Sequence, residues 1–196
     1  MDLPPGCSSA PTRGYALGRA GLAPPLDGAS QARRIGQTAG VSDTRHVTHQ
    51  EPVWRDRTNY IIQVDLEPHG MSQGTLEQIW ARTDDNERFE VCCLPFFTYG
   101  IALGDTVMWN DSDRTAEVVT SSGRRLVRSV FADREDAHAS HEAFHGSLVA
   151  TGALIEFSGS GFAAIDIDSD ERLAAVMSVL DPLNEAGRLS WEWGRE

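Results

Sequence analysis

The chain contains no lysine, since all 17 of its basic residues are arginine, set against 29 acidic residues. A lysine-free composition rich in alanine, glycine and arginine is typical of a GC-rich coding genome and favours a bacterial source. The net charge is -12, although residues 1–50 are slightly positive, so the remainder is more acidic still. Because an acidic surface repels phosphates, we expect no nucleic-acid partner. The surplus charge serves solubility or attracts a basic protein partner.

Long hydrophobic runs are also missing. A bilayer-spanning helix needs about 18 or more consecutive apolar residues, and the sequence has no such run. The N-terminal region has no apolar core of the kind that a secretory signal requires. We therefore expect no membrane partner and a cytoplasmic location.

Cysteine is scarce, with Cys7, Cys92 and Cys93 as the three examples. Adjacent residues in a strand point to opposite faces, so Cys92 and Cys93 should not pair with each other. An odd number of cysteines without a signal peptide indicates reduced thiols. We interpret the adjacent pair as ordinary strand residues, with a metal or redox role as the alternative.

Residues 1–52 are rich in proline, glycine, alanine, serine and arginine and show no sustained apolar periodicity. Such a segment buries too little apolar surface to offset the entropy lost on ordering. We expect it to be a disordered leader. The alternatives are an artefact of start-codon choice and a targeting segment.

Residues 59–121 are predicted to form a small β-barrel. Alternating or β-rich segments occur at 60–66, 76–82, 88–93, 106–109 and 115–120. Turn-forming residues separate them, as at Asp84-Asp85-Asn86 and Asp111-Ser112-Asp113. Short strands with frequent turns are typical of a barrel.

Residues 125–194 are predicted to form a ferredoxin-like plait, which makes the whole an α+β protein. The expected order is strand 125–131, helix 140–150, strands 154–157 and 162–167, helix from 168 or 169 to Gly187, and strand 189–193. This β-α-β-β-α-β order is the split pattern of the plait. At this first strand and the residue before it, Arg124, Arg125 and Arg128 are predicted to form a solvated sheet edge.

The stretch from Leu76 to Val107 contains Ile79-Trp80-Ala81, Pro95-Phe96-Phe97, Tyr99-Gly100 and Gly104-Asp105 at characteristic intervals. In these features it resembles the bacterial domain of unknown function 4265 family, and the similarity in layout extends over about residues 59–194. The resemblance implies the boundaries of the folded part. It implies no activity and no catalytic residue.

Aromatic residues near this motif define a candidate groove. Phe97, Tyr99 and Trp109 are predicted to line a site for a ligand or partner. The alternative is that these large side chains close the hydrophobic core, because each buried aromatic contributes roughly 1.5–3 kcal/mol. Asp105 is predicted to accept backbone N–H groups and fix its turn.

A second motif, His141-Glu142-Ala143-Phe144-His145, matches HExxH on a predicted helix. In zinc hydrolases the two histidines bind the metal and the glutamate activates its water. His138 is an additional candidate ligand, and Glu142 would be the catalytic base. However, Leu148 and Thr151 stand where an extended motif would place further residues, and Glu156 is the nearest downstream alternative. We favour packing residues and no cofactor, with zinc as the alternative.

The leading hypothesis is a non-enzymatic cytoplasmic binding protein with a protein partner, for example an immunity or resistance factor. The second hypothesis is a zinc-dependent hydrolase built on His141, Glu142 and His145. The third is a small-ligand sensor, by analogy with other plait domains.

Overall fold

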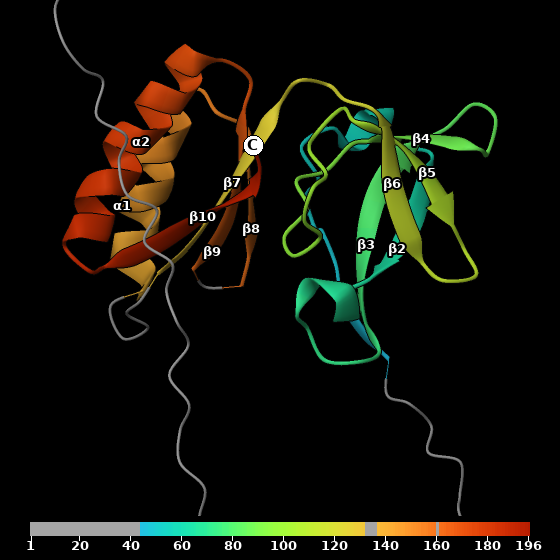
Figure 1. Ribbon diagram of the computed structural model, residues 1–196. Helices are drawn as coiled ribbons and strands as arrows, with labels where there is room; N and C mark the ends of the chain where they lie inside the picture. The colour runs from blue at the N-terminus through green and yellow to red at the C-terminus, as the bar shows by residue number, and fades with distance from the viewer. Residues whose placement is uncertain (1–43, 132–136, 160) are drawn as a thin grey trace, which may run out of the picture. The chain divides into compact units, whose positions relative to one another are not determined.

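The computed structural model describes residues 44–131, 137–159 and 161–196. Within these ranges the chain forms two β-sheets and two α-helices, so the expected α+β class is confirmed (Figure 1). None of the described helices is long and apolar enough to cross a membrane. Residues 1–43, most of the expected leader, lie outside the described ranges.

The first sheet contains β1 (Arg45–Val47), β2 (Tyr60–Asp65), β3 (Thr75–Arg82), β4 (Arg88–Val91), β5 (Thr106–Asn110) and β6 (Thr115–Thr120). Their order is β1-β3-β4-β5-β6, with β2 also paired to β3. β1 runs parallel to β3, and the other pairs are antiparallel. Two single-turn 3-10 helices, Arg55–Arg57 and Glu67–His69, flank β2.

The expected small β-barrel is wrong, because this sheet does not close. Its strand path ends at β6, which forms no ladder with β2. The two strands approach each other only at their ends, where the Asp65 backbone N–H donates to the Arg114 carbonyl. The chain from Cys92 to Asp105 is irregular and supplies no strand that would complete a barrel.

The second sheet contains β7 (Arg125–Phe131), β8 (Ile155–Ser158), β9 (Phe162–Ile167) and β10 (Leu189–Arg195), with helices α1 (Ala137–Ala150) and α2 (Asp170–Glu185). Its order is β10-β7-β9-β8, and all pairs are antiparallel. Ser169, one of the two predicted N-caps, caps α2 by accepting the Arg172 N–H, and the helix runs through Pro182.

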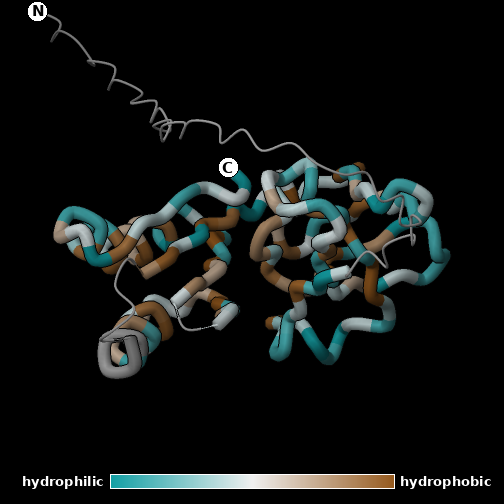
Figure 2. Tube along the Cα trace, turned by 90° about the horizontal axis from the view of Figure 1, so that it is seen from below, coloured by the Kyte–Doolittle hydropathy of each residue, from teal (hydrophilic) through white to brown (hydrophobic). Residues whose placement is uncertain are grey.

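The two helices cover one face of the second sheet, as Figure 1 shows. Phe144 and Val176 pack there against Val127 and Ile165. Because successive strand residues point to opposite faces, Leu126, Arg128 and Val130 face away from the helices. Figure 2 shows hydrophobic segments running through both sheets.

The described chain before β2, residues 44–59, is called the arm. It begins within the leader that was expected to extend to residue 52. It contains β1, and it continues through His49, which is buried although the chain there is irregular. The arm contacts both sheets, as described below. The predicted boundaries 59–121 and 125–194 between two domains stay a prediction.

Candidate functional site

The irregular segment 94–98 is held by a carboxylate from β3. Glu77 is fully buried and accepts hydrogen bonds from the backbone N–H groups of Phe96, Phe97 and Thr98, at 2.5, 3.1 and 2.7 Å, and from the Thr98 hydroxyl at 2.7 Å. Buried backbone donors need a partner, and this segment makes no strand ladder. One carboxylate therefore replaces the missing ladder.

His49 connects this carboxylate to the second sheet. Its Nε2 lies 3.2 Å from Glu77 Oε1, and its Nδ1 lies 2.5 Å from Glu156 Oε2 on β8. Its ring is stacked on Phe96, with the ring centroids 4.3 Å apart. Glu156 also accepts the backbone N–H groups of Val53 and Leu94. We call His49, Glu77 and Glu156 the buried triad.

Electrostatics keep His49 and Glu77 of the triad charged. Burial alone would lower the pKa of His49, but the contacts with Cys93, Glu156 and Glu77 outweigh it and raise that pKa to about 12. Burial alone would raise the pKa of Glu77, but its bonds to His49, Thr98 and Phe96 lower it. Burial raises the pKa of the Cys93 thiol. At neutral pH the His49 imidazolium therefore faces the Glu77 carboxylate.

The triad and Cys93 combine the residue types of a cysteine nucleophile, a base and an orienting acid. Their accessibility excludes that use in this conformation. The Cys93 residue is 0% exposed, as is the side chain of His49, and an active thiol requires a lowered pKa and an approach for substrate. The cluster therefore holds the fold, and its side chains are closed to solvent in this conformation.

Arg128 holds the opposite side of the same segment. Its Nε donates to the Pro95 carbonyl at 3.2 Å, and its Nη2 donates to the Thr98 carbonyl. The Tyr99 ring lies over the guanidinium, 4.3 Å from ring centroid to carbon. Thus Glu77 takes the N–H groups of the segment and Arg128 takes its carbonyls. Arg128 is 1% exposed and lies on a central strand, so the predicted solvated edge is wrong for this residue.

The hydrogen-bond donors of Arg128 are not all paired. Its Nη1 is buried and has no hydrogen-bond partner, and the nearest acid, Glu192 on β10, lies 3.9 Å away. Glu192 instead accepts the Tyr99 hydroxyl at 2.6 Å. Burial lowers the pKa of Arg128, although neighbouring Glu77, Tyr99 and Glu192 act in the opposite sense.

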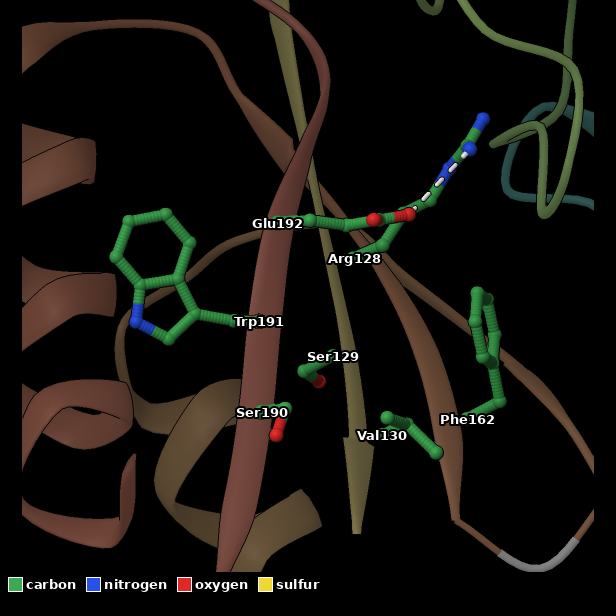
Figure 3. Close-up of a pocket in the computed structure, with 7 residues that line it drawn as sticks. All are labelled: Arg128, Ser129, Val130, Phe162, Ser190, Trp191 and Glu192. Carbon is green, nitrogen blue, oxygen red and sulfur yellow. Dashed lines mark ion pairs between the residues drawn. The ribbon is translucent and has the colours of Figure 1, made fainter. Parts of the chain in front are cut away.

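Next to Arg128 the helix-free face of the second sheet is hollowed. The hollow has a volume of about 190 Å³. Val130 pairs with Phe162 on one side and Ser190 on the other, and Figure 3 shows these side chains together, with Glu192 directed toward Arg128. We call this surface the Arg128 hollow. It combines an apolar floor with a buried cation that has a free donor.

The three predicted groove residues are distributed over two places. Phe97 packs on Phe162, with ring centroids 5.1 Å apart, and Tyr99 covers Arg128, so each contacts a residue that lines the Arg128 hollow. Trp109 lies on β5, where its Nε1 donates to the Gln63 carbonyl and its ring packs against aromatic neighbours in the first sheet. A shared groove of all three stays a prediction.

The HExxH segment lies on α1 as predicted. Glu142 and His145 are exposed, and the His145 ring packs against Phe157, with centroids 4.9 Å apart. The side chains of His138 and His141 lie outside the described residues. Glu156, the alternative third ligand, belongs to the buried triad. Within the described residues, no group of three histidine, cysteine or acidic side chains is placed to hold a metal, and the zinc alternative stays a prediction.

The residues that organise this region were missed in the sequence. Glu77, Arg128 and Glu156 each interrupt an apolar strand, which is a signal because charged groups are buried only when paired. Their partners are far apart along the chain, and His49 has no local signal. The Asp105 turn was predicted and is confirmed, since Asp105 accepts the N–H groups of Ala102 and Ser122.

Comparison with known proteins adds the family and the fold. The family model for the domain of unknown function DUF4265 matches residues 77–191. No curated protein matches the chain. Among solved structures, a hypothetical protein from Neisseria gonorrhoeae is similar with a TM-score of 0.51 and 18% identity, over 69% of this chain and 92% of that chain. That likeness concerns the fold alone, while the family match covers most of both sheets; the chain therefore belongs to the DUF4265 family.

Proposed function

We propose that this protein is a non-enzymatic binding protein and that the helix-free face of the second sheet is its recognition surface. The observation that carries the proposal is the Arg128 hollow. It is the place described above where an exposed apolar side chain, Val130 at 46% exposure, adjoins a buried cation with an unpaired donor. Apolar hollows with a few convergent polar groups are typical of binding sites.

The buried triad supports the same proposal, because its acid and base groups are used to hold the fold. Its strongly interacting acid and base groups are the kind that enzymes use. Here the carboxylates of Glu77 and Glu156 accept hydrogen bonds from the backbone N–H groups of the arm and of segment 94–98. A role in recognition therefore fits the molecule better than catalysis at this cluster.

For the partner we propose a cytoplasmic protein with basic groups, because the chain carries a net charge of -12. We also assign the second sheet to the ferredoxin-like plait. The support is its element order β-α-β-β-α-β with strand order β10-β7-β9-β8 and both helices on one face.

Paired valine substitutions test the recognition surface. Val130→Asp places a charge in the hollow, and Val119→Asp is the matched control, since Val119 lies on β6 of the first sheet and is 44% exposed. Tagged full-length protein and both variants are expressed in cells of the source species, and captured proteins are quantified by mass spectrometry. We expect a partner that the wild type and Val119→Asp retain, that Val130→Asp loses, and that salt releases because exposed charge pairs are screened.

Capture of the same proteins by all three forms would contradict the proposed surface. A circular dichroism melt of each variant accompanies the capture, so that loss of folding is distinguished from loss of binding.

A further inference from the structure

We infer that the Arg128 hollow binds a carboxylate carried on a compact apolar group, and that this carboxylate takes the place of Glu192 beside Arg128 Nη1. The inference deepens the proposed function, since it rests on the same surface and names the chemistry of what binds there. It follows from the unpaired nitrogen, from the size of the hollow and from the contacts of Glu192.

The unpaired nitrogen selects an anion. Two of the three guanidinium nitrogens of Arg128 donate to backbone carbonyls, while the third, Nη1, has no hydrogen-bond acceptor and only a long ion pair, 3.9 Å, with Glu192. A buried donor left without an acceptor is costly, and a bond between a guanidinium and a carboxylate is among the strongest hydrogen bonds in proteins. A carboxylate oxygen at Nη1 removes that cost.

Glu192 marks the position of the incoming group. Its carboxylate is 3.9 Å from Arg128 Nη1, which is too long for a hydrogen bond. Its side chain is 53% exposed, so it is free to turn toward solvent. Tyr99, which donates its hydroxyl to Glu192, then donates to the ligand carboxylate instead. Burial and the bond to Glu192 raise the pKa of Tyr99, so the hydroxyl remains protonated at neutral pH.

The size of the hollow limits the apolar part. Pockets for drug-sized molecules measure roughly 300–1,000 Å³, whereas this one has about 190 Å³. It therefore accepts one ring or one branched aliphatic group. Val130 and Phe162 supply the apolar contact, and Figure 3 shows both beside the Arg128 and Glu192 side chains.

Phenylacetate and its neutral analogue phenylacetamide are suitable probes, with binding to the full chain measured by calorimetry. We expect the acid to bind about tenfold or more tightly than the amide, because only the acid pairs a negative charge with the Arg128 guanidinium. Val130→Trp fills the hollow and should abolish binding of both. A peptide with a C-terminal phenylalanine, free or amidated, distinguishes a protein terminus from a free acid as the source of the carboxylate.

Two conservative substitutions test the exchange with Glu192. Glu192→Gln removes the competing negative charge and should tighten phenylacetate binding by about fivefold or more, while Tyr99→Phe should weaken it by a similar factor through one lost hydrogen bond. The matched control is Glu117→Gln, which removes an exposed acid of the first sheet and should leave the affinity unchanged. Both residues changed at the site are exposed, so the variants are expected to fold.

If acid and amide bound with equal affinity and Val130→Trp still abolished binding, the preference for a carboxylate would be wrong. The proposal that this face is a recognition surface would still hold. No binding of any probe would overturn the ligand chemistry, and the partner capture with Val130→Asp then decides separately whether the surface itself functions in recognition.

Discussion

Glu77 of the buried triad and Arg128 at the hollow bind the same segment, 94–98, from opposite sides. They differ in how completely their hydrogen-bonding groups are paired. Glu77 accepts four donors from the segment and contacts His49 as well. Arg128 donates to two carbonyls and keeps Nη1 without an acceptor. A fully paired buried charge indicates architecture, whereas an incompletely paired one beside an open hollow indicates a place for a ligand.

The largest expected effect is at Glu77. Glu77→Gln removes the charge that faces the His49 imidazolium and places an amide against three backbone donors, and it should lower the free energy of unfolding by about 3–5 kcal/mol. Urea denaturation measures the change, and Glu117→Gln on β6 is the exposed control, expected within about 0.5 kcal/mol of wild type. A loss below about 1 kcal/mol at Glu77 would show that the triad is not a principal support of the segment.

The pH dependence of stability tests the charge of His49. Its folded pKa of about 12 lies above an unfolded value of about 6.5, so its contribution is complete below pH 6.5 and is lost as the pH rises toward 12. Between about pH 7.5 and 8.5, before the cysteine thiols of the unfolded chain ionise, this one group should lower the free energy of unfolding by about 1.4 kcal/mol for each pH unit.

His49→Gln should remove that slope, and His46→Gln, which changes an exposed histidine of the same arm, should preserve it. Denaturant midpoints measured across the alkaline range supply the comparison. Identical slopes for wild type and His49→Gln would mean that the imidazole is neutral in the folded protein.

A smaller effect compares two hydroxyl groups. The Thr98 hydroxyl donates to Glu77 at 2.7 Å, while the Ser129 hydroxyl is buried without a hydrogen-bond partner beside Arg128. Thr98→Val should lower stability by about 1.5–3 kcal/mol, because it removes a bond to a charged acceptor. Ser129→Ala should change stability by no more than about 0.5 kcal/mol or increase it, because no bond is lost. If thermal melts showed a larger loss of stability for Ser129→Ala than for Thr98→Val, the distinction between the paired and the incompletely paired region would be wrong.

Much of the secondary structure could be predicted from local patterns. The strands Thr115–Thr120, Arg125–Phe131 and Phe162–Ile167 have the predicted bounds, because apolar alternation and the flanking turn residues are properties of neighbouring residues. The closed barrel was wrong for the opposite reason. Whether β6 meets β2 depends on a long-range pairing that no local pattern reports.

The candidate site was less predictable. His49 falls in an arm without apolar periodicity, and its partners Glu77 and Glu156 are 28 and 107 residues away along the chain. Arg128 was predicted to be solvated because a charge in a strand is usually exposed, and the sequence does not show that β7 lies between β10 and β9. The aromatic residues were easier to recognise, and Phe97 and Tyr99 do lie beside the polar groups that were missed.

One titration compares the two regions directly. Phenylacetate is added to isotope-labelled full-length protein while the backbone amide signals are followed by NMR. We expect saturating shifts at Val130, Ser190 and Glu192, with the amides of Val53 and Leu94 at Glu156 unchanged. Shifts confined to the triad and its arm, or no shifts in either region, would contradict the assignment of carboxylate binding to the Arg128 hollow.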